Sequence, residues 1–349
     1  KGIILNARIL WTYSACYKHF KEEKYKIMAY RAFNYLKEQF WDKEFEGVFW
    51  MLDAKGNVID DKKYIYAQAF AIYGLSEFYS AFNETEALTL SKKLFILIEN
   101  NCADNIYGGY FEVCTRNWIH LEDARLSTKD KKEPKSANTH LHMIESYSNL
   151  YQYWKSDKLR VKIKELLNVF TQFILRDNGI SLIAFLDRDW TPKSDVISFG
   201  HDIEASWLLY ESAQIINEPD LIAEIEKMSI TLAESVLKYG VDKEGGISNE
   251  MVSDTIDNDR HWWNQAEAIV GFLNAFELTQ NQKFLIAAWN TWVFVKNNVI
   301  DKKNGEWYEC VDINGNTFKD DKVRSWKSPY HNSRAALEVI KRVEKILHE

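Results

Sequence analysis

Two histidines in this chain have neighbours that suit acid–base chemistry. His201 and Glu204 are spaced i, i+3 in a helix predicted after Gly200, so the carboxylate could orient the imidazole and raise its basicity, as in a general base. The same pair could also serve only to cap that helix. Asn138 and His142, spaced i, i+4, share one helical face, which fits either a site or a buried hydrogen bond without function.

Further candidates recur at the predicted starts of helices. His331 follows Pro329 and Tyr330, a helix-start signal. The series Arg8, Tyr66, Asn138, His201, Trp262 and His331 has steps of 58, 72, 63, 61 and 69 residues. In a closed ring of helices, equivalent positions converge on the axis, so we predict that these residues line one concave pocket. Arg8 alone could instead be a surface cation whose stem packs on the core.

Three tryptophans are candidates for stacking on a ligand. Trp262, Trp263 and Trp326 could each fill the core. Adjacent helical positions, however, point about 100° apart, so Trp262 and Trp263 cannot occupy the same core slot. One of these two rings is therefore suited to stacking on a sugar, in a helix that also carries Glu267.

The elements that would position these residues repeat along the chain. Glycine turns with aromatic flanks recur at Gly47, Gly109, Gly179, Gly246 and Gly305, with steps of 62, 70, 67 and 59 residues. Between turns the sequence predicts two helices. The first is nearly free of charge, as from Tyr64 to Phe82, and is therefore enclosed. The second is amphipathic, as at 159–174, and therefore lies outside.

Counting these helices predicts the fold class. Enclosed helices begin near residues 5, 64, 137, 201, 262 and 330, and amphipathic ones near 24, 86, 157, 219 and 281. We predict an all-α protein, an (α/α)6 barrel forming a single domain over residues 1–349, with one outer helix missing before Lys1. An open α-solenoid is the alternative, although it does not need enclosed helices so poor in charge.

Composition narrows the classes of partner. The net charge of −7 has its signs interspersed, which disfavours nucleic acid and anionic membranes as partners. No apolar run reaches membrane-spanning length, and residues 1–10 are too polar for a secretion signal. The four cysteines form no C-x-x-C pair, so a cytoplasmic location is expected. The 13 Trp, 18 Tyr and 19 Phe suit a protein that stacks flat ligands.

Common metal, nucleotide and nucleophile motifs are absent from the sequence. His140 and His142 point apart on a helix, His201 and Glu204 supply only two ligands, and no H-E-x-x-H occurs. The sequence also lacks G-x-x-x-x-G-K-[ST], G-x-G-x-x-G and G-x-S-x-G. We therefore expect neither a metal nor a cofactor.

Five stretches in order resemble a known family. They are residues 6–11 (NARILW), 66–73 (YAQAFAIY), 200–207 (GHDIEASW), 262–268 (WWNQAEA) and 326–332 (WKSPYHN). They resemble the N-acylglucosamine 2-epimerase superfamily, most closely its cellobiose 2-epimerase branch. The resemblance covers essentially the whole chain. It implies an (α/α)6 barrel and metal-independent inversion at C2 of the reducing-end glucose of β-1,4-linked disaccharides, cellobiose or lactose, through ring opening and an enediolate.

The resemblance also implies roles for individual residues. His201 and His331 match the family's catalytic pair, and Glu204 and Glu267 would orient His201. Arg8 and Tyr66 would stabilise the enediolate oxygens, while Asn138 and His142 would hold open-chain hydroxyls or assist ring opening. Trp263 and Trp326 would stack on the sugar, with Trp262 beside them in the pocket. A disaccharide is the expected partner of a monomer or weak dimer.

Other activities share these features. N-acylglucosamine 2-epimerases and mannose isomerases of the same superfamily use a similar enediolate. Inverting glycoside hydrolases also occur on (α/α)6 barrels, with two carboxylates roughly 6.5 to 9.5 Å apart. A non-catalytic sugar-binding barrel would need only the stacking tryptophans.

Overall fold

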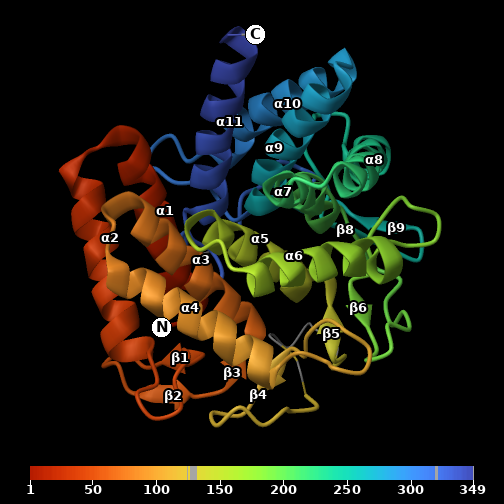
Figure 1. Ribbon diagram of the computed structural model, residues 1–349. Helices are drawn as coiled ribbons and strands as arrows, with labels where there is room; N and C mark the ends of the chain where they lie inside the picture. The colour runs from red at the N-terminus through yellow and green to blue at the C-terminus, as the bar shows by residue number, and fades with distance from the viewer. Residues whose placement is uncertain (124, 126–131, 319–320, 349) are drawn as a thin grey trace. The chain divides into compact units, whose positions relative to one another are not determined.

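The structure, a computed structural model, describes residues 1–123, 125, 132–318 and 321–348. Helices make up most of the described chain (Figure 1). The α-helices are α1 (Ile3–Phe20), α2 (Glu23–Tyr35), α3 (Ile65–Phe82), α4 (Thr85–Asn101), α5 (Ala137–Tyr153), α6 (Asp157–Val169), α7 (Phe199–Ile216), α8 (Pro219–Ser235), α9 (Trp262–Thr279), α10 (Gln282–Phe294) and α11 (Tyr330–His348). All eleven begin within two residues of their predicted starts, which confirms the helical pattern.

The described chain divides into two compact units. The first comprises Lys1–Phe170, Phe185–Ser194 and Arg324–Tyr330, and the second comprises Thr171–Ala184, Asp195–Val323 and His331–Glu349. Helices α1 to α6 lie in the first unit, and α7 to α10 with nearly all of α11 lie in the second. That residues 1–349 form a single domain stays a prediction.

Helices α1 to α10 come in tight pairs, each an enclosed helix followed by an amphipathic one. The prediction that α11 is enclosed is correct only for its first turns, because between Ala336 and Lys345 only Arg342 is buried. In α3 nearly every residue is buried, and its one charged residue, Glu77, binds Lys18 at 2.9 Å. Helices α1, α3, α7 and α9 each end at a left-handed residue, namely Lys21, Asn83, Asn217 and Gln280. This sharp reversal of the backbone lets the next helix begin three residues later. Among the described helices, none combines the length and the apolar run needed to cross a bilayer.

Four amphipathic helices continue into a single π-helical turn before the glycine turns. These turns span Leu36–Phe40, Phe170–Ile174, Val236–Gly240 and Val295–Val299. In α6 the buried residues Leu159, Ile163 and Leu166 form the predicted apolar stripe. The apolar face of each such helix thus packs against the protein, and the opposite face meets solvent.

Short antiparallel strands anchor the starts of the enclosed helices. The strands are β1 (Met51–Leu52), β2 (Val58–Asp60), β3 (Lys63–Tyr64), β4 (Val113–Cys114), β5 (Lys135–Ser136), β6 (Phe185–Leu186), β7 (Ile197–Ser198), β8 (Glu250–Val252), β9 (Thr255–Asp257), β10 (Arg260–His261) and β11 (Cys310–Val311). They pair as β1–β2, β3–β4, β5–β6, β7–β8–β9 and β10–β11. Strands β3, β5, β7 and β10 directly precede α3, α5, α7 and α9, so each pairing fixes where a helix begins.

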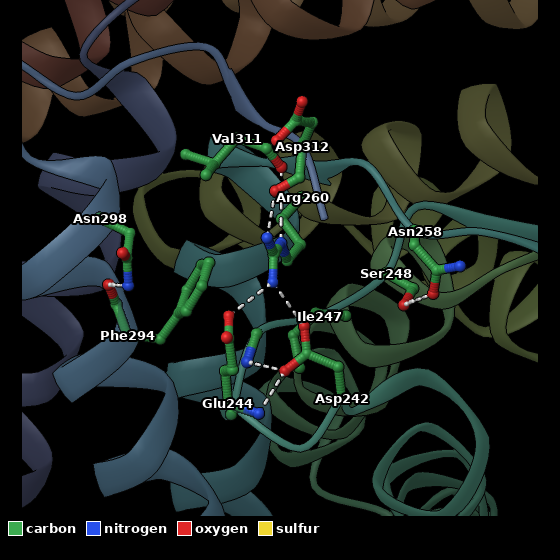
Figure 2. Close-up of polar contacts among 12 residues, drawn as sticks. Asp242, Glu244, Ile247, Ser248, Asn258, Arg260, Phe294, Asn298, Val311 and Asp312 are labelled. Carbon is green, nitrogen blue, oxygen red and sulfur yellow. Dashed lines mark hydrogen bonds and ion pairs between the residues drawn. The ribbon is translucent and has the colours of Figure 1, made fainter. Parts of the chain in front are cut away.

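A buried arginine reinforces the start of α9 in the second unit. Figure 2 shows Arg260 donating to the carboxylates of Asp242 and Glu244, at 2.9 and 3.0 Å, and to the carbonyl oxygens of Val311 and Asp312. The arginine is fully buried, and its charge is matched by these acceptors. The strand residue just before α9 is therefore held by carboxylates of one segment of the chain and by carbonyl oxygens of another.

Glutamines in the first turn of α3 and α9 bind the strand-like segment after the preceding glycine turn. Gln68 accepts from the backbone N–H of Val48 at 2.8 Å and donates to its carbonyl at 2.9 Å. Gln265 makes the same two bonds to Ile247, both at 2.8 Å. A side-chain amide thereby completes the backbone pairing of a short buried segment.

The equivalent positions of α5 and α7 carry titratable groups. His140 accepts from the N–H of Tyr110 at 3.1 Å through Nε2, and its Nδ1 lies 2.7 Å from the carbonyl of Ser136. Burial lowers the pKa of His140 to about 4, so this histidine is neutral and structural. Asp202 accepts from the N–H of Leu182 at 2.9 Å, and burial raises its pKa to about 8.

Candidate active site

In the second unit, His201 and His331 contact the same tryptophan. His201, Trp263 and His331 lie in the first turns of α7, α9 and α11. The centroid of the Trp263 ring system is 4.8 Å from that of His201 and 5.8 Å from that of His331. The two imidazoles are thus no farther apart than the sum of these distances. Folding therefore brings together two predicted catalytic residues that are far apart in the sequence.

Glu267 fixes the orientation of His331. Its Oε1 lies 2.6 Å from Nδ1 of His331 and accepts from Nη2 of Arg334 at 2.7 Å, while its Oε2 accepts from Nε1 of Trp207 at 3.1 Å. A carboxylate in contact with these donors is ionised and only accepts, so Nδ1 of His331 carries the hydrogen. Nε2 is then the proton-accepting nitrogen of His331. Glu267, which we expect from the sequence to orient His201, thus holds His331.

The described hydrogen bonds give His201 and Glu204 one further partner each. Oγ of Ser198 lies 2.7 Å from Nδ1 of His201, whereas Glu204 accepts from Nη2 of Arg334 at 2.6 Å. Arg334 is 2% exposed and joins Glu204 to Glu267. Neither Ser198 nor Arg334 is a candidate from the sequence. Ser198 directly precedes α7, three residues before His201, and Arg334 lies three residues after His331 on α11, so this spacing is the signal that could have found them.

A metal ion could be held by three groups in this cluster. Glu204, Glu267 and His331 each offer one ligand atom, and these atoms lie within 4.8 Å of one another. The guanidinium of Arg334, however, bonds to both carboxylates and already compensates their charge. The donor set therefore fits an ion-pair network, and metal independence stays a prediction.

The adjacent tryptophans of α9 have different environments. Trp262 is 5% exposed and packs in the hydrophobic core of the second unit, with its ring nearly perpendicular to His331 at 6.2 Å. Trp263 is only partly buried and faces both histidines. A Cβ at Gly200 would collide with the Trp263 ring, so the glycine before His201 makes this approach possible.

In the first unit, Arg8 is the centre of a second cluster. Its Nη2 donates to the hydroxyl of Tyr66 and its Nη1 to the carbonyl of Trp326, both at 2.9 Å. The guanidinium lies over the rings of Phe70 and Tyr330, at 4.5 and 5.1 Å. Arg8 is 5% exposed, so the interpretation as a surface cation is wrong. Among the described residues, its Nε has no hydrogen-bond partner.

His142 belongs to the Arg8 cluster. Its ring packs edge-on against Tyr66 at 5.1 Å and beside Phe70 at 4.7 Å. Its Nδ1 lies 2.8 Å from Oε2 of Glu145, a residue that the sequence did not single out although it shares the i, i+3 spacing of His201 and Glu204. Within the described chain, Oδ1 of Asn138 has no hydrogen-bond partner, and the role of Asn138 in the site stays a prediction.

A cavity of about 220 Å³ adjoins the Arg8 cluster in the first unit. It is lined by Gly2, Ile3, Ile4, Trp50, Met51, Arg324, Ser325 and Trp326. The Trp326 ring lies 5.8 Å from Trp50 and 6.0 Å from Tyr66. Trp326, which we expect to stack on a sugar, is thus a wall of this cavity.

Comparison with known proteins identifies the family. The sequence profile of the N-acylglucosamine 2-epimerase (GlcNAc 2-epimerase) family matches residues 1–335. The chain belongs to this family. A cellobiose 2-epimerase of Bacteroides fragilis is 45% identical to this family member over 97% of the chain and 87% of the relative. A cellobiose 2-epimerase of Dictyoglomus turgidum is 38% identical over 98% of the chain and 88% of the relative.

Solved structures of epimerases confirm the fold class. Cellobiose 2-epimerase from Bacillus thermoamylovorans matches with a TM-score of 0.95 and 38% identity, covering 98% of this chain and 88% of that one. A D-mannose isomerase, at 21% identity and a TM-score of 0.85, has the same fold. This family member is accordingly an all-α protein of the (α/α)6 barrel class, and the open α-solenoid is wrong. The missing outer helix stays a prediction.

Proposed function

We propose that the protein inverts C2 of the reducing-end glucose of β-1,4-linked disaccharides such as cellobiose and lactose. The relatives named cellobiose 2-epimerase, at 45% and 38% identity, support this substrate class. The contact of both His201 and His331 with Trp263 is the observation that carries the chemistry. Two imidazoles beside one aromatic ring system suit a reaction that needs a base and an acid on one flat intermediate.

Proton transfer at C2 requires the open-chain sugar. The C2 hydrogen is acidic only beside the C1 aldehyde, so ring opening precedes its removal. One imidazole takes the C2 proton, the C–H electron pair forms the enediolate, and the other imidazole delivers a proton to the opposite face of C2. Imidazole, with an unperturbed pKa of about 6.5, accepts and donates protons near neutrality.

The contacts of the proposed acid–base groups support defined roles. Glu267 holds Nδ1 of His331, which leaves Nε2 to exchange the proton. Arg334 keeps Glu267 and Glu204 in place through its two bonds. Trp263 would support the flat face of the sugar.

For Arg8 and Tyr66 we propose donation to the enediolate oxygens, the role that the family resemblance implies. Arg8 is buried, and its Nε has no hydrogen-bond partner among the residues described, so donor capacity remains for an anionic oxygen. Donors already in place when charge develops contribute strongly to catalysis. For His142 we propose a role in ring opening, which the family resemblance also implies.

Proton NMR of cellobiose in D₂O tests this function. The protein, treated with a chelator, should replace the C2 hydrogen by deuterium and form glucosyl-mannose. His201→Ala and His331→Ala should each lower the exchange rate roughly 10²- to 10⁴-fold, because each removes one proton-transfer group. His19→Ala, at an exposed histidine of α1, is the matched control and should exchange at the wild-type rate.

The same spectra separate the other candidate functions. Near-normal exchange in either histidine variant, with the fold retained by circular dichroism, contradicts the two-histidine assignment. Preferred turnover of N-acetylglucosamine or mannose would indicate another activity of the superfamily. Free glucose would indicate a hydrolase, and binding without deuterium uptake would indicate a sugar-binding protein.

We also propose a cytoplasmic location, on the basis of cysteine usage. The Sγ atoms of Cys102 and Cys114 lie 3.4 Å apart, and all four cysteines are buried free thiols. A reducing compartment would preserve such thiols. The assignment as a monomer or weak dimer stays a prediction.

A further inference from the structure

Two buried hydrogen bonds connect His142 to a residue far away in the sequence. Nδ1 of His142 lies 2.8 Å from Oε2 of Glu145. The hydroxyl of Tyr330, 185 residues farther along the chain, donates to Oε1 of the same carboxylate at 2.7 Å. All three residues are at most 5% exposed and belong to the first unit. Glu145 is thus held at both oxygens.

This arrangement selects one tautomer of His142. A tyrosine hydroxyl donates to an ionised carboxylate, and an ionised carboxylate only accepts. Nδ1 of His142 must then carry the hydrogen, so Nε2 carries the lone pair. A carboxylate behind an imidazole also stabilises the imidazolium that forms when Nε2 takes a proton.

We propose that Glu145 and Tyr330 are positioning residues that hold His142 with Nε2 as the proton acceptor for opening the sugar ring. This inference rests on the proposed function. Nε2 takes the proton of the anomeric hydroxyl, and the electron pair of that O–H bond forms the C1=O1 double bond. The C1–O5 bond breaks with its electrons on O5, and the imidazolium returns the proton to O5.

The surroundings of His142 favour this role over simple packing. Tyr66 of α3 packs edge-on against the imidazole, and the guanidinium of Arg8 of α1 binds the Tyr66 hydroxyl. Glu145 contacts the imidazole directly, and the guanidinium of Arg8 lies over Phe70, which packs beside the imidazole. The bond from Nδ1 to a carboxylate also repeats the one between His331 and Glu267.

Glu99 provides a structural counterpart in the same unit. It accepts from the buried hydroxyls of Tyr110 at 2.6 Å and Tyr147 at 2.9 Å. It therefore resembles Glu145 in its tyrosine contacts, while its described hydrogen bonds include no histidine. Glu99→Gln and Tyr147→Phe accordingly serve as matched controls for Glu145→Gln and Tyr330→Phe.

Ring opening can be followed separately from epimerisation, through NMR magnetisation exchange between the α and β anomers of cellobiose. Glu145→Gln should slow the catalysed exchange about 10- to 100-fold, with KM changed less than about twofold. Tyr330→Phe should act in the same direction, about 3- to 10-fold. Glu99→Gln and Tyr147→Phe should lower only Tm.

The tautomer itself gives a readout that is independent of activity. ¹⁵N NMR of the wild-type protein should show His142 protonated at Nδ1, whereas protonation at Nε2 overturns the inference. A Glu145→Gln protein with wild-type anomer exchange also overturns it. If Glu145→Gln does not fold, the inference is tested by the anomer exchange of Tyr330→Phe and by the tautomer of His142 in the wild-type protein. Absence of deuterium uptake at C2 by the wild-type protein would instead reject the proposed function.

Discussion

At the scale of single residues, neighbours decide what a histidine can do. His140 and His142 lie two positions apart on α5. Both ring nitrogens of His140 meet backbone groups, and its pKa is lowered to about 4 by burial, so it exchanges no proton near neutrality. His142 instead meets the carboxylate of Glu145 through Nδ1. Spacing along the helix does not distinguish these two roles.

Asp202 should make the stability of the protein depend on pH. Its folded pKa is raised to about 8 by burial, and an unfolded aspartate titrates near about 3.9. Its contribution to the free energy of unfolding is therefore complete below the lower value and is lost as pH rises through the higher one. Asp202→Asn cannot ionise and can bond to Leu182 as Gln265 bonds to Ile247.

Urea unfolding at about pH 5 and about pH 9 checks this expectation. The wild-type protein should lose more stability over this interval than Asp202→Asn does. Asp61→Asn, at an exposed position, is the control and should keep the wild-type difference. Equal losses in the wild-type protein and Asp202→Asn would show that Asp202 is ionised in the folded state throughout.

At the scale of elements, two pairs of helices pack through a glycine. A Cβ at Gly74 of α3 would lie 2.8 Å from the carbonyl oxygen of Ala7 in α1. A Cβ at Gly271 of α9 would lie 2.8 Å from the carbonyl oxygen of Ile203 in α7. These glycines therefore set the distance between helices that carry Arg8 and His201. These carbonyl oxygens belong to the backbone and cannot rotate away, and at Gly271 the side chain of Ile203 lies closer still.

Gly271→Ala should destabilise the protein by about 1 to 3 kcal/mol, because the added methyl group forces α7 and α9 apart. Chemical denaturation monitored by tryptophan fluorescence measures the change. Thr89→Ala, at an exposed position of α4, should stay within about 0.5 kcal/mol of the wild-type protein. A Gly271→Ala protein as stable as wild type would mean that the two helices adjust without cost.

At the scale of the whole molecule, charge favours a neutral substrate. The net charge of −7 is spread among 44 basic and 51 acidic residues that are interspersed along the chain. Such a distribution gives no extended potential to attract a charged ligand. The proposed disaccharides carry no charge, in keeping with this pattern.

The value of kcat/KM for cellobiose should therefore be nearly independent of salt. Between about 0.05 and about 0.5 M NaCl we expect kcat/KM to change less than about twofold. A neutral substrate is not drawn to the protein by long-range electrostatic attraction, so salt has no such attraction to screen. Initial rates at low substrate concentration measure it, with the enzyme's circular dichroism checked at both salt concentrations. A tenfold fall would contradict the assignment of a neutral substrate and point to a charged sugar.

Local sequence patterns determined the helices, their pairing and the family. Apolar periodicity and glycine turns are properties of neighbouring residues, so they predict where helices begin without knowledge of the fold. They also placed His201 and His331 at equivalent helix starts, and the structure brings both to Trp263. The motifs around these residues pointed to the epimerase family, which the profile match over residues 1–335 confirms.

Only the tertiary structure decided which groups meet. It pairs His331 with Glu267, 64 residues away, and connects Glu145 to Tyr330 across 185 residues. It also places Arg334 between the carboxylates of Glu204 and Glu267, which the sequence leads us to expect beside His201. Such partners depend on how helices rotate and pack against one another. A hydrogen bond requires a donor–acceptor distance that is correct to within a few tenths of an ångström. The periodicity of a single helix does not specify distances between helices that precisely.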